Sequence, residues 1–336
     1  MKQAAIKKFS NIRLQPLPPD NTTGGRKKSV PGPTSLMHVM SLLLFHIFRR
    51  PMFVDTATKA GIYLCAAAGL ALIFDFIRVP PSYFSNKYNL LNIIFVKWGW
   101  GWTFVFLSAF QIFSSFVYTA SSVSLMRSHL LRIAAGTGCW YSVTGFINLV
   151  HEWSGHCQPH NIVMTNRHRP QYRLACQRAG GIWIGFDISG HCFLLVLCSL
   201  WIMEEVRCMQ CWSRLSDIIK PYERDEDTRA DSMTSHIRGL STNQLKTMRS
   251  SFRRLTGSVR VLFSICGCLS MIWDFMFLCT IMYFHTMPSK LIGTILGVAC
   301  WFLCYRVIFP LAKTGEWYGL APGMPGDGVV NFTSRR

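Results

Sequence analysis

Long runs that hold almost no charged residues recur along the chain, and they restrict the folds that it can adopt. Six such runs fall at about residues 60–77, 98–119, 133–150, 188–206, 260–285 and 291–310. A helix needs roughly 20 apolar residues to cross the hydrocarbon core of a bilayer. Since 50% of the residues are hydrophobic and only 15% are charged, the sequence predicts an all-α membrane protein, a bundle of six transmembrane helices.

The basic residues predict which side of the membrane each connecting segment occupies. The formal net charge is +19, and the lysines and arginines lie mostly within residues 1–56 and 207–258. Because cytosolic segments of membrane proteins are enriched in Lys and Arg, both segments and both chain termini are predicted to be cytosolic. Membrane topology therefore accounts for the charge, and no nucleic-acid partner is expected.

These signals divide the chain into parts with different expected roles. They are a disordered basic tail at residues 1–56 with an interfacial helix at 35–48, a transmembrane domain at 57–312, a cytosolic loop at 207–258 and a cytosolic tail at 313–336. The charged loop is expected to be a solvated surface that could bind cytosolic protein partners.

A polar cluster, Asp187-Ile-Ser189-Gly190-His191, opens the fourth apolar run. Asp and Ser are both good helix N-caps, so His191 is expected in the first turn of the helix that follows. Unpaired backbone N–H groups and the positive end of the helix dipole favour a bound phosphate there. The cluster therefore predicts a site where His191 gives a proton to a phosphate, with a plain interfacial cap as the alternative.

A second histidine reaches the same face of the membrane. The fourth and fifth runs are consecutive, so the start of one and the end of the other share a face, which is predicted to be lumenal. His285 stands at the end of the fifth run. Two histidines on one face suit a nucleophile and a general acid in phosphoryl transfer. The alternative is that His285 only extends to the interface.

The predicted lumenal segments also contain lysines that could bind phosphate and cysteines that could form a disulfide. Lys87 and Lys97 lie in the first segment and could reach a bound phosphate. Cys157 and Cys176 lie in the second and are expected to form a disulfide, because the lumenal compartment is oxidising. The histidines and cysteines of that segment match no zinc-ligand spacing, so neither a metal nor another cofactor is expected.

Asp274 lies in the middle of the fifth run. A carboxylate at the centre of a transmembrane helix costs about 2.5 to 3.5 kcal/mol on insertion scales. The sequence therefore predicts that Asp274 faces the bundle and has a structural or lipid-contacting role.

Several motifs together resemble one protein family. They are FDISGHCFLL at residues 186–195 followed by Glu204-Glu205, Ser85-Asn86-Lys87 through Trp102-Thr-Phe, and Met276 to Thr280 with Tyr283-Phe-His285. Across about residues 57–310 the chain resembles the fat storage-inducing transmembrane (FIT) proteins, which are related to lipid phosphate phosphatases. The resemblance implies a multi-pass protein of the endoplasmic reticulum membrane that acts in lipid droplet biogenesis.

The resemblance also implies an activity, the hydrolysis of fatty acyl-CoA to acyl 4'-phosphopantetheine and adenosine 3',5'-bisphosphate. It implies that His285 attacks phosphorus and that His191 protonates the leaving oxygen. The phosphatase motif Lys-x6-Arg-Pro does not occur in this sequence, so other residues must hold the phosphate. The candidates are Ser189, Gly190, Lys87, Lys97, Arg178 and Lys290.

A second class of function stays open, a non-catalytic protein that binds diacylglycerol or triacylglycerol and partitions neutral lipid into droplets. The Met and Phe content fits lipid binding, but it also fits any membrane core. If His191→Ala preserved droplet formation while Asp274→Ala abolished it, lipid binding would be the better account.

Overall fold

The computed structural model describes residues 36–77, 79–158, 172–212, 215, 242–313 and 321–328. Within these residues the chain is almost entirely helical, and its sheet is a two-stranded hairpin. The predicted tail before residue 36 lies outside the described residues, as do residues 216–241 of the predicted loop and most of the C-terminal tail.

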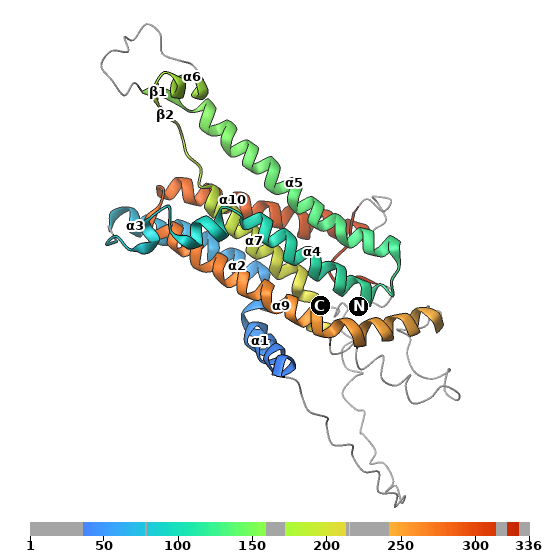
Figure 1. The fold of residues 1–336 in the computed structure, drawn as a ribbon. Coiled ribbons are helices and arrows are strands. Elements are labelled where there is room, and N and C mark those ends of the chain that lie inside the picture. The colour runs from blue at the N-terminus through green and yellow to red at the C-terminus, as the bar shows by residue number, and fades with distance from the viewer. Residues whose placement is uncertain are drawn as a thin grey trace, which may run out of the picture. The chain divides into compact units, whose positions relative to one another are not determined.

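Most of the long helices pack around one central helix, α7 (Figure 1). The α-helices are α1 (Leu36–Met52), α2 (Thr56–Cys65), α3 (Ala71–Phe76), α4 (Gly99–Tyr118), α5 (Val123–Trp153), α6 (Arg173–Arg178), α7 (Gly190–Val206), α9 (Thr242–Tyr283) and α10 (Met287–Phe302). The π-helix η1 (Ala66–Leu70) joins α2 to α3, and η2 (Tyr83–Ser85) and η3 (Asn92–Val96) precede α4. Beyond α7 and α10 lie η5 (Arg207–Cys211), η7 (Leu303–Ile308) and η8 (Phe309–Lys313).

Four described helical segments are long and apolar enough to cross a membrane, so the chain is a mostly helical membrane protein with four candidate spans. They are Thr56–Phe76, Gly99–Tyr118, Asn243–Tyr283 and Met287–Leu311. The other two predicted spans, 133–150 and 188–206, fall on α5 and α7. Helix α7 has 17 residues, about 25 Å, which is short of a typical hydrocarbon core. The run in α5 is diluted by Gly, Ser, Thr and Asn.

Helix α7 is the core of the bundle. All its residues from Cys192 to Val206 except Leu194 are buried, and it packs against α4, α9 and α10 (Figure 1). A helix that is apolar all round belongs in the interior. Two glycines of α10 permit the close approach, because a Cβ at Gly293 would lie 2.4 Å from the Ser189 carbonyl oxygen and one at Gly297 2.9 Å from the Phe193 carbonyl oxygen.

The far end of α7 carries a buried charge network. Glu205 accepts hydrogen bonds from Arg132 at 2.7 and 3.0 Å and from the Tyr305 hydroxyl at 2.6 Å. Glu204 is paired with Arg306 at 2.6 Å and with Arg207 at 3.0 Å. Since buried carboxylates need such partners, this network fixes the depth of α7 against its neighbours.

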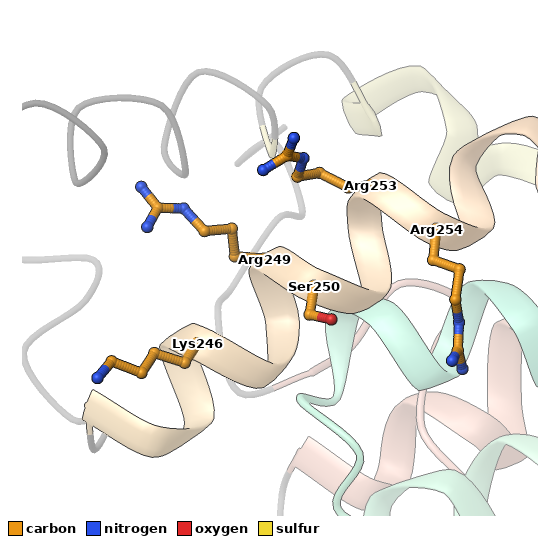
Figure 2. Close-up of a pocket in the computed structure, with 5 residues that line it drawn as sticks. All are labelled: Lys246, Arg249, Ser250, Arg253 and Arg254. Atoms are coloured by element: carbon orange, nitrogen blue, oxygen red, sulfur yellow. The ribbon is translucent and has the colours of Figure 1, made fainter.

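Helix α9 begins at Thr242, well before the predicted span at 260–285, so the second part of the predicted loop 207–258 is helical. No Pro or Gly interrupts residues 242–256, which explains why the helix continues through charged sequence. Its early turns carry a basic pocket of about 480 Å³ (Figure 2). The residues that line it are spaced three and four apart on one side of the helix: Lys246, Arg249, Ser250, Arg253 and Arg254.

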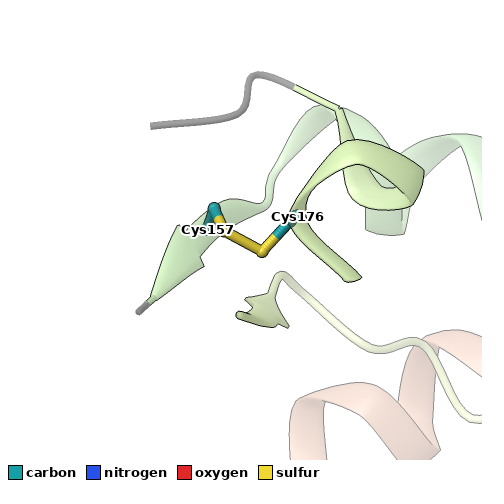
Figure 3. The surroundings of a disulfide bond; sticks show 2 residues. All are labelled: Cys157 and Cys176. Carbon is teal, nitrogen blue, oxygen red and sulfur yellow. A yellow bond between two sulfur atoms is a disulfide. The ribbon is translucent and has the colours of Figure 1, made fainter. Parts of the chain in front are cut away.

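A small hairpin with a disulfide connects α5 to α7. Strand β1 (His156–Gln158) pairs antiparallel with β2 (Ile182–Ile184), and Cys157 of β1 is bonded to Cys176 of α6 (Figure 3). Gly181 passes close to this bond, since a Cβ there would lie 2.8 Å from the Cys157 sulfur. The sequence predicted the cysteine pair as a disulfide but predicted no strands, because each strand has only three residues.

Candidate active site

His191 lies in the first turn of α7, where the sequence predicted it. Ser189 is the N-cap, and its hydroxyl oxygen accepts a hydrogen bond from the Cys192 N–H at 3.3 Å. The Ser189 N–H donates to the Ser289 carbonyl oxygen at 3.1 Å, so the cap is also attached to α10. Ser189 is fully buried, and its role in the structure is to position His191.

Asn92, at the start of η3, holds the His191 ring. Its Oδ1 atom lies 3.0 Å from His191 Nε2, while its Nδ2 atom donates to the Lys87 carbonyl oxygen at 2.7 Å. Because the amide nitrogen is committed to Lys87, the oxygen faces the imidazole, and His191 Nε2 must be the donor. The Nδ1 atom of His191 is then the ring nitrogen that can exchange a proton with a substrate.

His285 stands in the turn between α9 and α10 and has a left-handed backbone conformation, with φ at 53°. Its Nδ1 atom lies 3.4 Å from the Oδ2 atom of Asp187, and the Asp187 side chain is 61% exposed. The sequence favours both Asp187 and Ser189 as helix caps, but in the structure Ser189 caps α7 and Asp187 faces His285. A carboxylate on Nδ1 leaves Nε2 available as a nucleophile.

Electrostatics around His285 favour its neutral form. Burial lowers the pKa of His285 below its usual value, and the Asp187 carboxylate partly opposes that shift. The ammonium charges of Lys87 and Lys290 lower the same pKa further. A neutral imidazole at neutral pH has the lone pair that a nucleophile needs.

A clamp holds the turn that carries His285. The Asp75 carboxylate accepts a hydrogen bond from the Met287 N–H at 2.7 Å and one from Lys290 Nζ at 3.2 Å. Lys290 also donates to the Ile281 carbonyl oxygen at 2.9 Å, and its side chain is 2% exposed. The Lys290 ammonium therefore closes the turn, its charge acts on His285, and two of its three N–H donors are used within the protein.

The lysines that were predicted to bind phosphate lie within electrostatic range of the histidines. His285, Asp187, Lys87 and Lys97 are all close enough for their charges to act on His191. Gly190 borders space that protein does not fill, since an added Cβ would have no atom within 4 Å. The fold thus gathers two imidazoles, a carboxylate and several ammonium groups at one end of the bundle.

Arg178 is the predicted phosphate ligand that stands apart. It lies in α6 beside the hairpin, beyond the end of α5 (Figure 1). Within the described ranges no hydrogen bond or ion pair joins Arg178 to either histidine. The same residues contain no group of three His, Cys, Asp or Glu side chains placed to hold a metal ion.

Sequence reasoning missed Asn92 and Asp75 as individual site residues. Asn92 is one of several asparagines in the segment before α4, and Asp75 stands near the end of the first apolar run. Each acquires its role from a partner distant in the sequence, His191 for Asn92 and Met287 for Asp75. No local motif could identify such pairs.

Comparisons with known proteins agree with the motifs. The family described as "Fat storage-inducing transmembrane protein" matches residues 80–305. The protein named "Acyl-coenzyme A diphosphatase FITM2" of Drosophila melanogaster is 31% identical over 96% of this chain and 74% of its own length. The human protein of that name is 31% identical over 76% of this chain and 81% of its own, and that of Xenopus laevis is 32% identical over 78% and 82%.

No solved structure matches the chain. The family match covers well over half of the chain, and the relatives are aligned over most of their length as well as most of this one. The chain therefore belongs to the fat storage-inducing transmembrane protein family.

Proposed function

We propose that this protein is a fatty acyl-CoA diphosphatase, which hydrolyses fatty acyl-CoA to acyl 4'-phosphopantetheine and adenosine 3',5'-bisphosphate. Its relatives carry the name acyl-coenzyme A diphosphatase. The observation in this chain that carries the proposal is His285 paired with Asp187 within electrostatic reach of His191. An oriented histidine nucleophile beside a histidine acid suits cleavage of a phosphoric anhydride.

His285 is the proposed nucleophile. Asp187 retains the proton on Nδ1, and the Nε2 lone pair attacks one phosphorus of the diphosphate. The Nε2–P bond forms while the bond from that phosphorus to the bridging oxygen breaks. For this step His191 is the imidazolium, a form that the negative charge of the bound diphosphate favours. With its Nε2–H still donated to Asn92, it gives its Nδ1 proton to this oxygen, which leaves on the other half of the substrate.

Water completes the proposed cycle. Neutral His191 accepts a proton from a water molecule whose oxygen attacks the phosphohistidine phosphorus, and the P–N bond breaks. The second phosphate product leaves, and both histidines regain their starting protonation states. Lys87, Lys97 and the backbone N–H groups of Gly190 and His191 at the start of α7 would offset the negative charge of the substrate and the transition state.

Turnover by the purified protein in detergent tests this function. His285→Ala should lower kcat for hexadecanoyl-CoA by at least about a thousand-fold, because the nucleophile is lost. His156→Ala, an exposed histidine of β1, is the matched control and should keep normal turnover. Unchanged hydrolysis in a folded His285→Ala variant would exclude this mechanism.

We also propose six spans in the endoplasmic reticulum membrane, with α5 and α7 as the additional two, both termini cytosolic and the site lumenal. The disulfide between Cys157 and Cys176 supports this orientation, because it lies in the segment that leads into the His191 end of α7 and suits an oxidising compartment. The Asn-x-Ser/Thr sequons at Asn21 and Asn331 should then carry no glycan, and a glycan on either would reverse the orientation.

Lipids and proteins complete the proposed partners. Membrane lipid and neutral lipid would contact the outward apolar side chains of the spans, such as Leu72, Ile73 and Phe302. Cytosolic proteins would bind the charged segment at 207–258. Diacylglycerol or triacylglycerol binding without turnover remains the second candidate, and loss of turnover in His285→Ala distinguishes the enzyme from it.

A further inference from the structure

A pocket of about 310 Å³ lies between α2 and α9, which belong to two of the candidate spans. Its walls are mainly apolar and include Pro51, Val54, Ile62, Met271, Phe277 and Leu278. This volume is at the lower end of the range for small-molecule sites, about 300 to 1,000 Å³. The pocket also contains charged groups, which a simple lipid-facing groove does not need.

Asp274 is the centre of the polar group in this pocket. It accepts hydrogen bonds from Lys59 Nζ at 2.8 Å, from Ser199 Oγ at 3.2 Å and from the Tyr63 hydroxyl. Its charge is therefore fully accommodated by the protein. Asp274 was predicted to face the bundle, and the structure places it there with these partners.

Lys59 has donor capacity that these contacts do not use. Its ammonium group has three N–H donors, and the structure gives it two acceptors, Asp274 Oδ2 and Ser270 Oγ at 3.3 Å. The side chain is 14% exposed and lines the pocket. A charged residue inside a membrane span is costly and commonly marks a ligand pathway. A carbonyl oxygen in the pocket could accept a hydrogen bond from the third N–H donor of Lys59.

The distance along α9 from Asp274 to His285 matches the distance in acyl-CoA from the thioester to the nearer phosphorus. Asp274 and His285 are 11 positions apart along α9 and its following turn, about 16 Å at 1.5 Å per residue. In acyl-CoA, roughly 14 bonds separate the nearer phosphorus from the thioester carbon, about 16 Å when extended as a polypeptide backbone is. Phe277 and Leu278 line the pocket between these two levels.

We propose that this pocket holds the thioester end of acyl-CoA, with Lys59 donating a hydrogen bond to the thioester carbonyl oxygen. The assignment rests on the proposed diphosphatase function. The pantetheine arm would pass Leu278 and Phe277, and the acyl chain would continue along Met271 toward Val54 and Pro51. The contact is remote from the phosphorus and is equal in the ground and transition states, so it acts on KM and not on kcat.

Two substrates that differ by one oxygen test the assignment. Hexadecanoyl-CoA has the thioester carbonyl, and its thioether analogue hexadecyl-CoA has the same length without it. A hydrogen bond from a charged donor predicts that the wild-type KM is about ten-fold or more lower for the thioester. In Lys59→Met the two KM values should become equal while kcat is retained. Lys246→Met, in α9 and outside this pocket, is the control and should keep the wild-type ratio.

Lys59→Met leaves the Asp274 carboxylate without its cationic partner, so this variant could misfold. A second variant tests the assignment without leaving that charge unpaired. Lys59→Met combined with Asp274→Leu removes both charges, which folded proteins often tolerate, and should lose the same discrimination. If either variant still had a lower KM for the thioester than for the thioether, or if the wild type had equal KM values for both, the assignment of this pocket would be overturned. The proposed diphosphatase function would still stand. Hydrolysis of neither substrate by the wild type would overturn the proposed function, and this assignment with it.

Discussion

The Nδ1 atom of His285 lies 3.4 Å from the Oδ2 atom of Asp187, although one residue follows α9 and the other precedes α7. The packing of α7 against α9 brings these two chain segments together. In the same region Asn92 orients His191, so each imidazole has its own partner. The relationship gives the two histidines different chemistry, one with a free Nε2 atom and the other with a free Nδ1 atom.

The pH dependence of turnover should move in opposite directions in two variants. The Asp187 carboxylate raises the pKa of His285, so Asp187→Asn should move the acid limb of kcat/KM to lower pH. Lys87 lowers that pKa, so Lys87→Ala should move the limb to higher pH. Turnover in Asp187→Asn should also fall by about a hundred-fold or more, because the ring loses its orienting partner.

The matched control for this pH experiment is Glu152→Gln, an exposed carboxylate at the end of α5. It should leave both the acid limb and turnover in place. Shifts of the same sign in Asp187→Asn and Lys87→Ala would contradict the assignment of His285 as the titrating nucleophile.

Asn92 should act through His191. Asn92→Leu removes the acceptor at 3.0 Å from Nε2 and should lower kcat by about a hundred-fold, within the range for general acid catalysis. The double variant Asn92→Leu with His191→Ala should be no slower than His191→Ala alone, because residues that act as a unit are not additive. Additive losses, measured by kcat under saturating substrate, would show that Asn92 has a separate role.

Close packing between α10 and α7 should be essential for the site. An added Cβ at Gly293 would lie 2.4 Å from the Ser189 carbonyl oxygen, so Gly293→Ala should displace the cap of α7. Overpacking of this kind costs about 1 to 3 kcal/mol, and turnover should fall with it. Gly257→Ala in α9 is the control, since its Cβ would meet no atom within 4 Å. Thermal unfolding in detergent and kcat measure the two effects, and equal behaviour of the two variants would refute the packing argument.

The buried pair of Arg132 and Glu205 should stabilise the bundle only as a pair. Both side chains are almost fully buried, at 0% and 1% exposure. Arg132→Met or Glu205→Met leaves one buried charge uncompensated, and each should cost about 3 to 5 kcal/mol of unfolding free energy. The double variant should cost less than either single one. Denaturant unfolding in detergent measures this, and a double variant less stable than both single variants would contradict it.

Part of the candidate site could be predicted from the sequence, because its local signals are strong. Ser189 before an apolar run is a helix cap, and the chain order places His191 and His285 at the same face. The partners of the histidines could not be predicted in the same way. The sequence favours Asp187 as a cap, whereas its contact with His285 depends on how α7 packs against α9. Lys290 was read as a phosphate ligand, but its contacts are with Asp75 and the Ile281 carbonyl oxygen.

The class of the protein follows from hydropathy and motifs, because these are local properties of the chain that do not depend on how the helices pack. Hydropathy predicts a helical membrane protein, the motifs resemble the fat storage-inducing transmembrane family to which the chain belongs, and four of the six predicted spans coincide with the candidate spans. The packing of the helices decides that Asn92 holds His191 and that Lys59 meets Asp274 inside a pocket. These contacts join residues far apart in the chain, and their geometry depends on how whole helices pack.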